Sequence, residues 1–186
     1  MPLRTRTGRC VTVLLTAAVT SGVLTGCQSL AAASLTASCE DTESRVRELD
    51  SHAVLESRPE GTVVPQGFEK DSGCWADSGD VVLHTDRTYV FPGDEADVLK
   101  HYRTAAERDG WKLSGTTEEA PDKDGPAGLC FDLGKGDRAA TLGVYFLTEE
   151  ILDEEGRRPG PEFSSGVGYR VAITSAADGS ETSCSD

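Results

Sequence analysis

Three kinds of residue in this chain could take part in chemistry: three histidines, clustered carboxylates and six cysteines. A metal site would need His52, His84 and His101 to converge, but the sequence pattern places them on a helix, a strand and a second helix. We therefore expect solvated or locally paired histidines and no metal site. No serine lies in a G-x-S-x-G or S-x-x-K motif, so we assign no catalytic residue and expect no cofactor.

The carboxylates cluster at Glu149–Glu150 and Asp153–Glu155, beside the basic pair at 157–158. Glycoside hydrolysis by paired carboxylates needs two groups about 5–10 Å apart across a cleft, which neighbours in one loop do not supply. A solvated loop with local ion pairs is the favoured interpretation. Asp122–Gly125 resembles the start of an EF-hand loop, but the remaining oxygen ligands are missing, so no calcium site is expected.

Four of the cysteines predict disulfides: Cys39, Cys74, Cys130 and Cys184. An even number in an exported domain is typical of two bridges, and no two of them have the close spacing of zinc ligands. Four cysteines allow three pairings. Shorter loops close at lower entropic cost, which favours Cys39–Cys74 with Cys130–Cys184, although the other pairings stay open.

The remaining two cysteines belong to the N-terminal region. Three arginines precede an apolar run, Val11–Val23, which is too short to span a membrane that requires ~20 apolar residues. Leu24–Cys27 (LTGC) follows and resembles a bacterial lipobox. The resemblance implies that the Cys27 thiol carries a diacylglyceryl group and that a peptidase cuts just before it. The alternative is an ordinary secretory signal with an incidental cysteine.

The expected organisation is therefore a signal peptide at 1–26, a lipid-modified cysteine with a short tether at 27–38, and one acidic domain at 39–186. The tether is small and polar, and its eleven residues after Cys27 span at most ~36–40 Å. Fifteen of the eighteen basic residues and all 32 acidic residues follow the leader, which gives the mature chain a charge of −17. This charge opposes nucleic-acid binding, so the expected membrane contact is through the lipid.

The hydrophobic pattern predicts a mixture of helices and strands. The helix from Asp94 to Asp109 is the clearest, because Asp94 can cap its start and Gly110 can adopt the left-handed conformation after its end. The other expected elements are an amphipathic helix at 40–56, a helical turn at 149–155, and strands at 79–91, from 111, at 129–133, at 139–148 and at 167–173.

This order indicates an α+β fold, with a mainly antiparallel sheet of about five strands, helices packed on one face and stabilising disulfides. If the first two expected strands were neighbours, the helix between them would make them parallel. Trp75 and Trp111 could stack on a ligand, but packing is the favoured role for both.

Three segments, Pro92–Trp111, Leu129–Phe131 and Gly168–Ile173, resemble actinobacterial lipobox-anchored lipoproteins of uncharacterised function. The resemblance implies a fold and no catalytic residues. The expected function is a lipid-anchored, non-enzymatic domain on the extracytoplasmic face of the cell membrane, which binds an envelope protein or a small ligand. The alternatives are a small cell-envelope hydrolase and a cation- or metal-binding lipoprotein. A deep pocket that gathers His84 or His101 with carboxylates would favour the alternatives, whereas a shallow apolar surface would favour binding.

Overall fold

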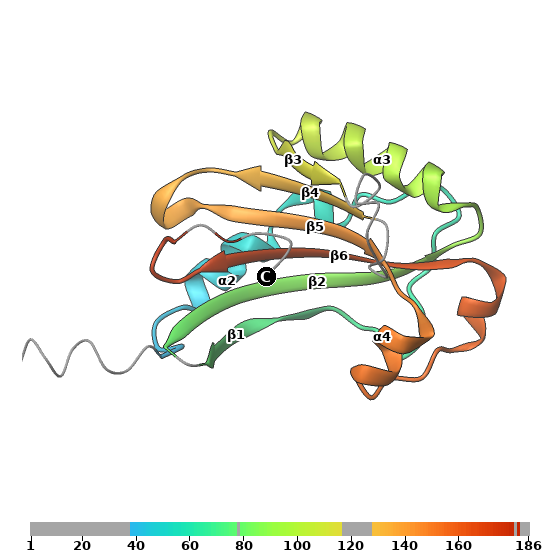
Figure 1. Cartoon of the computed structure of the whole chain (residues 1–186), viewed down its shortest axis with the longest axis horizontal. Coiled ribbons are helices and arrows are strands. Elements are labelled where there is room, and N and C mark those ends of the chain that lie inside the picture. The colour runs from blue at the N-terminus through green and yellow to red at the C-terminus, as the bar shows by residue number, and fades with distance from the viewer. Residues whose placement is uncertain (1–37, 78, 117–127, 181, 183–186) are drawn as a thin grey trace, which may run out of the picture. The chain divides into compact units, whose positions relative to one another are not determined.

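Six strands form one antiparallel sheet in the computed structural model, which describes residues 38–77, 79–116, 128–180 and 182. The described residues belong to one compact unit. The strands are β1 (Asp71–Asp77), β2 (Asp80–Phe91), β3 (Lys112–Thr116), β4 (Gly128–Leu133), β5 (Ala140–Phe146) and β6 (Val167–Ala176). Their order across the sheet is β1-β2-β6-β5-β4-β3 (Figure 1).

This sheet confirms the expected α+β class, but it has six strands where about five were expected. The additional strand is β1, which forms a hairpin with β2 through a turn in which Gly79 has a φ of +102°. The sequence of β1, DSGCWAD, has no alternation of apolar residues. Such alternation marks a strand with one buried face, and β1 lies at an edge where most of its side chains are exposed.

Within the described residues, three α-helices accompany the sheet: α2 (Glu43–Asp50), α3 (Glu95–Arg108) and α4 (Glu149–Glu154). On the face that forms the core, α2 contacts β1, β2 and β6, and α3 contacts β3, β4 and β5. The prediction of a single helix over 40–56 is wrong in extent, because α2 ends at Asp50. After α2 the backbone becomes extended at His52 (ψ 124°), and the 3-10 helix η1 (Ala53–Leu55) follows. The 3-10 helices η3 (Gly136–Arg138) and η4 (Pro161–Ser165) lie later in the chain.

Helix α3 begins and ends as the sequence predicts. The Asp94 carboxylate accepts a hydrogen bond from the amide of Asp97 at 3.0 Å, which satisfies one of the free amides of the first turn. Gly110 adopts a φ of +90°. The Trp111 amide then donates back to the carbonyl of Ala106 at 2.9 Å, the bond that closes a Schellman motif.

The chain crosses the whole sheet between β2 and β3. These two strands are separated by β6, β5 and β4, so they are not neighbours and do not form a parallel pair. All strand pairings in the sheet are antiparallel. As a result, β1 and β3 are the two edges, and α3 lies on the β3 side (Figure 1).

The core fills the space between the sheet and the helices α2 and α3. Alternate residues of β2, β6, β5 and β4 point into it. Burying one such aliphatic or aromatic side chain contributes about 1.5–3 kcal/mol. The fully buried members include Leu83, Tyr89, Tyr102, Phe131, Leu142, Tyr169, Val171 and Ile173.

Candidate functional site

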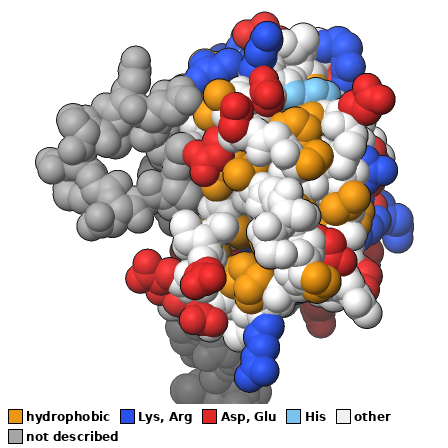
Figure 2. Space-filling view, turned by 90° about the vertical axis from the view of Figure 1, so that its right-hand side faces the viewer, with side chains coloured by type: hydrophobic (Ala, Val, Ile, Leu, Met, Phe, Trp, Pro, Cys, Tyr) orange, Lys and Arg blue, Asp and Glu red, His pale blue; other side chains and the backbone are white. Residues whose placement is uncertain are grey.

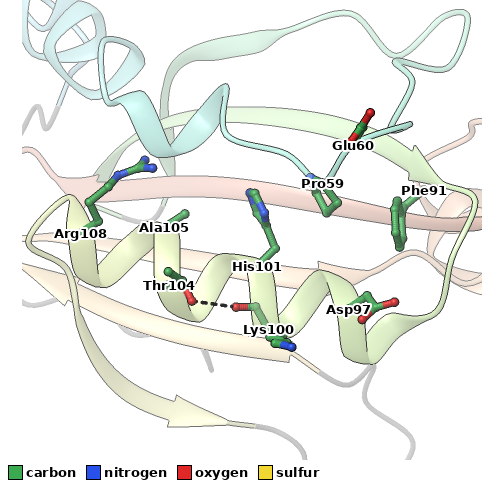
Figure 3. A pocket seen from close by; sticks show the side chains of 9 residues that line it. All are labelled: Pro59, Glu60, Phe91, Asp97, Lys100, His101, Thr104, Ala105 and Arg108. Atoms are coloured by element: carbon green, nitrogen blue, oxygen red, sulfur yellow. Dashed lines mark hydrogen bonds between the residues drawn. The ribbon is translucent and has the colours of Figure 1, made fainter.

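A groove runs along α3 on the side that faces the loop after η1. It encloses about 480 Å³. The helix contributes residues spaced three or four apart, which lie on one face of a helix. Figure 3 shows this stripe and the opposite wall, formed by the loop and the end of β2. The lining residues are Asp97, Lys100, His101, Thr104, Ala105 and Arg108 from α3, with Pro59, Glu60 and Phe91 opposite.

The groove combines an apolar interior with a charged margin. Pro59 and Phe91 are half-buried and Ala105 is buried, whereas Lys100 and Glu60 are exposed at the margin. Figure 2 shows the end of the domain at which α3 begins and α4 lies. On that face hydrophobic side chains lie in the middle, and charged side chains of both signs lie around them.

His101 of the groove takes part in one arrangement that resembles catalytic machinery, with Ser57, which does not line the groove. The Ser57 Oγ and His101 Nε2 atoms are 3.0 Å apart and share a hydrogen bond. The Tyr102 hydroxyl donates to the Ser57 carbonyl, which fixes that residue against α3. Burial, with a smaller contribution from the positive charge of Arg108, lowers the pKa of His101. The imidazole is therefore neutral near pH 7 and can accept a proton.

One further feature of acyl-transfer catalysis is missing in the described part of the chain. There, no carboxylate oxygen lies within 4.0 Å of a His101 nitrogen, so the ring lacks the group that orients a catalytic histidine.

The other two histidines lie elsewhere. The ring of His52 meets that of Trp111 edge to face, with 5.2 Å between the centroids. His84 lies on the sheet face opposite the core, where its Nε2 is 3.9 Å from a carboxylate oxygen of Asp71. Within the residues that the structure describes, no three His, Cys, Asp or Glu side chains are placed to hold a metal ion. The Asp122–Gly125 segment lies outside those residues.

The acidic cluster around α4 has a partner that sequence reasoning missed. Glu155 accepts two hydrogen bonds from Arg170 of β6, at 2.5 and 2.7 Å, while Arg157 is 4.0 Å away. Arg170 is only 9% exposed and also donates to the hydroxyls of Tyr145 and Thr88. Its hydrogen bonds lower the pKa of Glu155. The signal in the sequence was an arginine inside an otherwise apolar strand.

A second buried arginine lies on the core face of the sheet. Arg87 of β2 donates to Asp50, at the end of α2, at 2.9 Å and to Glu56, after η1, at 2.8 Å. Lys70 also pairs with Asp50. Both arginines therefore attach a short helix to the sheet, and we assign them structural roles.

The structure confirms one of the two expected disulfides. Cys39 and Cys74 are joined, with 5.7 Å between their Cα atoms. Cys130 is also disulfide-bonded, but Cys184 lies outside the described residues, so the Cys130–Cys184 pairing stays a prediction. Cys27, the expected lipidation site, likewise lies outside them.

The two tryptophans have different environments. Trp111 is 2% exposed, so the expected packing role is confirmed for it. Trp75 is 49% exposed, and the same expectation is wrong there. Trp75 directly follows the disulfide-bonded Cys74 in β1, at an edge of the sheet.

No known protein family, curated protein sequence or solved structure matches this chain. No helix in the described part of the chain is long and apolar enough to cross a membrane.

Proposed function

We propose that this chain is an exported lipoprotein whose folded domain binds an envelope protein or a small ligand and does not catalyse a reaction. The basic and apolar leader followed by LTGC supports lipid attachment at Cys27. The Cys39–Cys74 disulfide supports an oxidising compartment, because such bonds persist outside the cytosol. The proposed location is the extracytoplasmic face of the cell membrane, with no role for nucleic acid.

The α3 groove is the observation that favours binding. Its half-buried Pro59 and Phe91 can contact an apolar group, and Lys100 and Arg108 can meet a negative charge at the margin. An apolar interior with a few polar groups is the usual composition of a ligand site. The proposed ligand therefore has an apolar part and an anionic group.

A dye with those two properties tests the groove. Anilinonaphthalene sulfonate has an aromatic body and one negative charge, and its fluorescence rises in an apolar site. Thr104→Phe fills the groove from α3, whereas Glu107→Phe places the same side chain on an exposed position of α3 outside the lining. We expect the first variant to lose the dye signal and the second to keep it. Equal binding by both variants would exclude the groove as the binding site.

Detergent partitioning tests the anchor. Two or more acyl chains hold a protein stably in a membrane, whereas a chain without lipid is not retained. The mature wild-type protein should enter the detergent phase, and Cys27→Ala should move to the aqueous phase. Unchanged partitioning of the variant would rule out Cys27 as the anchor.

The Ser57–His101 hydrogen bond favours a second candidate, a small envelope hydrolase that acts on ester or amide substrates. A fluorophosphonate probe reacts with an activated serine. Labelling of the wild type that disappears in Ser57→Ala, and in His101→Gln, would favour the hydrolase. Absence of labelling in the folded wild type would favour the binding domain.

A further inference from the structure

Large hydrophobic side chains are exposed along one edge of the sheet. Trp75 is 49% exposed on β1, and Val63 and Val64 are 46% and 51% exposed in the loop before it. Val63 bridges to Val90 of β2, on the side of β2 that does not pair with β6. β1 pairs with the same side of β2 further along. The three side chains therefore belong to one edge, which we call the β1 edge.

The β1 edge is extended. Trp75 pairs with Val82, and Val63 pairs with Val90, eight residues further along β2. At ~3.3 Å per residue, the two exposed regions are about 26 Å apart. A flat surface can contact both regions at once, whereas a small ligand cannot.

The anchored part of the chain joins the domain at this edge. Cys39 is bonded to Cys74, the residue before Trp75. Only eleven residues separate Cys39 from Cys27, and a segment of that length spans at most about 36–40 Å. A lipid on Cys27 would therefore keep Trp75 close to the bilayer surface.

We propose that the β1 edge faces the membrane, with Trp75 in the interfacial layer of the bilayer to which Cys27 is anchored. The inference rests on the proposed lipid anchor. Tryptophan favours this layer because its ring is apolar and its N–H can still reach water or headgroups. α3 contacts β3, β4 and β5, toward the other edge of the sheet (Figure 1).

The charges near the β1 edge limit how deep it can lie. Glu40, Asp41, Asp71 and Asp80 are exposed around the disulfide and the β1–β2 turn. They are repelled by anionic headgroups over a distance of about 8 Å at physiological salt. We therefore expect shallow contact, which is stronger on phosphatidylcholine than on phosphatidylglycerol.

The chain has two tryptophans, which provide a built-in control. The lipidated mature protein is reconstituted in phosphatidylcholine vesicles whose acyl chains carry bromine near the headgroup. Bromine quenches only a tryptophan within the bilayer. We expect loss of the Trp75 emission in the wild type and no quenching in Trp75→Phe, whose remaining Trp111 is 2% exposed. Aqueous acrylamide should quench the wild type less in vesicles than in detergent-free Cys27→Ala.

The outcomes separate the orientation from the anchor. Vesicle-bound protein whose Trp75 is quenched by acrylamide and not by bromine would overturn the membrane-facing edge and leave the anchor intact. Trp75 shielded from both quenchers would also overturn it, because another protein surface would then cover the edge. Protein that fails to enter the vesicle fraction would overturn the anchor, and the orientation with it.

Discussion

The two tryptophans of this chain lie at opposite edges of the same sheet and have opposite environments. Trp111 precedes β3, packs against His52 and is 2% exposed. Trp75 lies in β1, follows a disulfide-bonded cysteine and is 49% exposed. At the β3 edge, Leu113 is 43% exposed, but Trp111 itself is buried and stabilises the fold. At the β1 edge, a disulfide joins Cys74 to Cys39. The neighbouring Trp75 is exposed and can contact a surface outside the domain.

The largest expected effect distinguishes the two tryptophans directly. Trp111→Ala should lower the free energy of unfolding by about 3–5 kcal/mol, because it empties a fully buried site. Trp75→Ala should change it by about 0.5 kcal/mol or less, as is usual for an exposed position. Urea unfolding of both variants measures the contrast. Similar losses in the two variants would show that Trp75 also packs in the core.

The next effect concerns how the β1 edge is held. The Cys39–Cys74 bridge closes a loop with a sequence separation of 35, and such a loop contributes about 3–4 kcal/mol. The double variant Cys39→Ala, Cys74→Ala should lose that stability while dye binding at the α3 groove is retained. Loss of dye binding in a variant that is still folded would mean that the two sides of the sheet are coupled.

The Glu155–Arg170 ion pair lies away from both edges of the sheet. It tests whether a charged contact, as well as apolar burial, contributes to the free energy of unfolding. Glu155→Gln removes the charge that faces the buried Arg170 and should cost roughly 1–3 kcal/mol, since Glu155 is partly exposed and screened by water. The hydrogen bonds from Arg170 hold the pKa of Glu155 in the folded protein below its ordinary value of 4.5. The stability that Glu155 contributes is therefore full above pH 4.5 and is lost as the pH falls through the folded pKa. The urea midpoints of variant and wild type should therefore converge as the pH falls below 4.5 and through the folded pKa. A gap that stays constant over this range would contradict the ion pair.

The smallest expected losses of stability come from replacing one glycine at each edge by alanine, and the two losses should be equal. Gly110 precedes Trp111 and Gly79 lies in the β1–β2 turn, with φ of +90° and +102°. An added Cβ meets nothing closer than 4.0 Å at Gly110 and nothing within 4 Å at Gly79. Alanine at either position should therefore cost only the backbone penalty of roughly 1 kcal/mol, and Gly110→Val should cost more. A Gly110→Ala protein that is more stable than the parent would count against the helix cap.

Local sequence signals predicted the elements that carry their own pattern. α3 has its cap, its apolar stripe and its terminal glycine within twenty residues, and β5 alternates cleanly. β1 was missed because an exposed edge strand needs no apolar alternation. The break in the first helix was also missed, because it depends on η1 packing Val54 and Leu55 into the core.

The candidate site was harder to predict because its parts come together only through tertiary contacts. The groove joins α3 to Pro59 and Phe91, and Ser57 lies 44 residues before its partner His101. The Glu155–Arg170 pair likewise joins a helix end to a strand across the following loop. No spacing along the chain encodes these approaches. The cysteines were different, since chain entropy alone favoured the Cys39–Cys74 pairing.

Lipid attachment at Cys27 is the premise for both the location and the orientation of the domain. Mass spectrometry of the N-terminal peptide, from protein purified out of its native membrane, tests it most directly. We predict a chain that begins at Cys27 and carries a diacylglyceryl group on its thiol. A peptide that retains residues before Cys27, or one with a free Cys27 thiol, would contradict the lipid anchor.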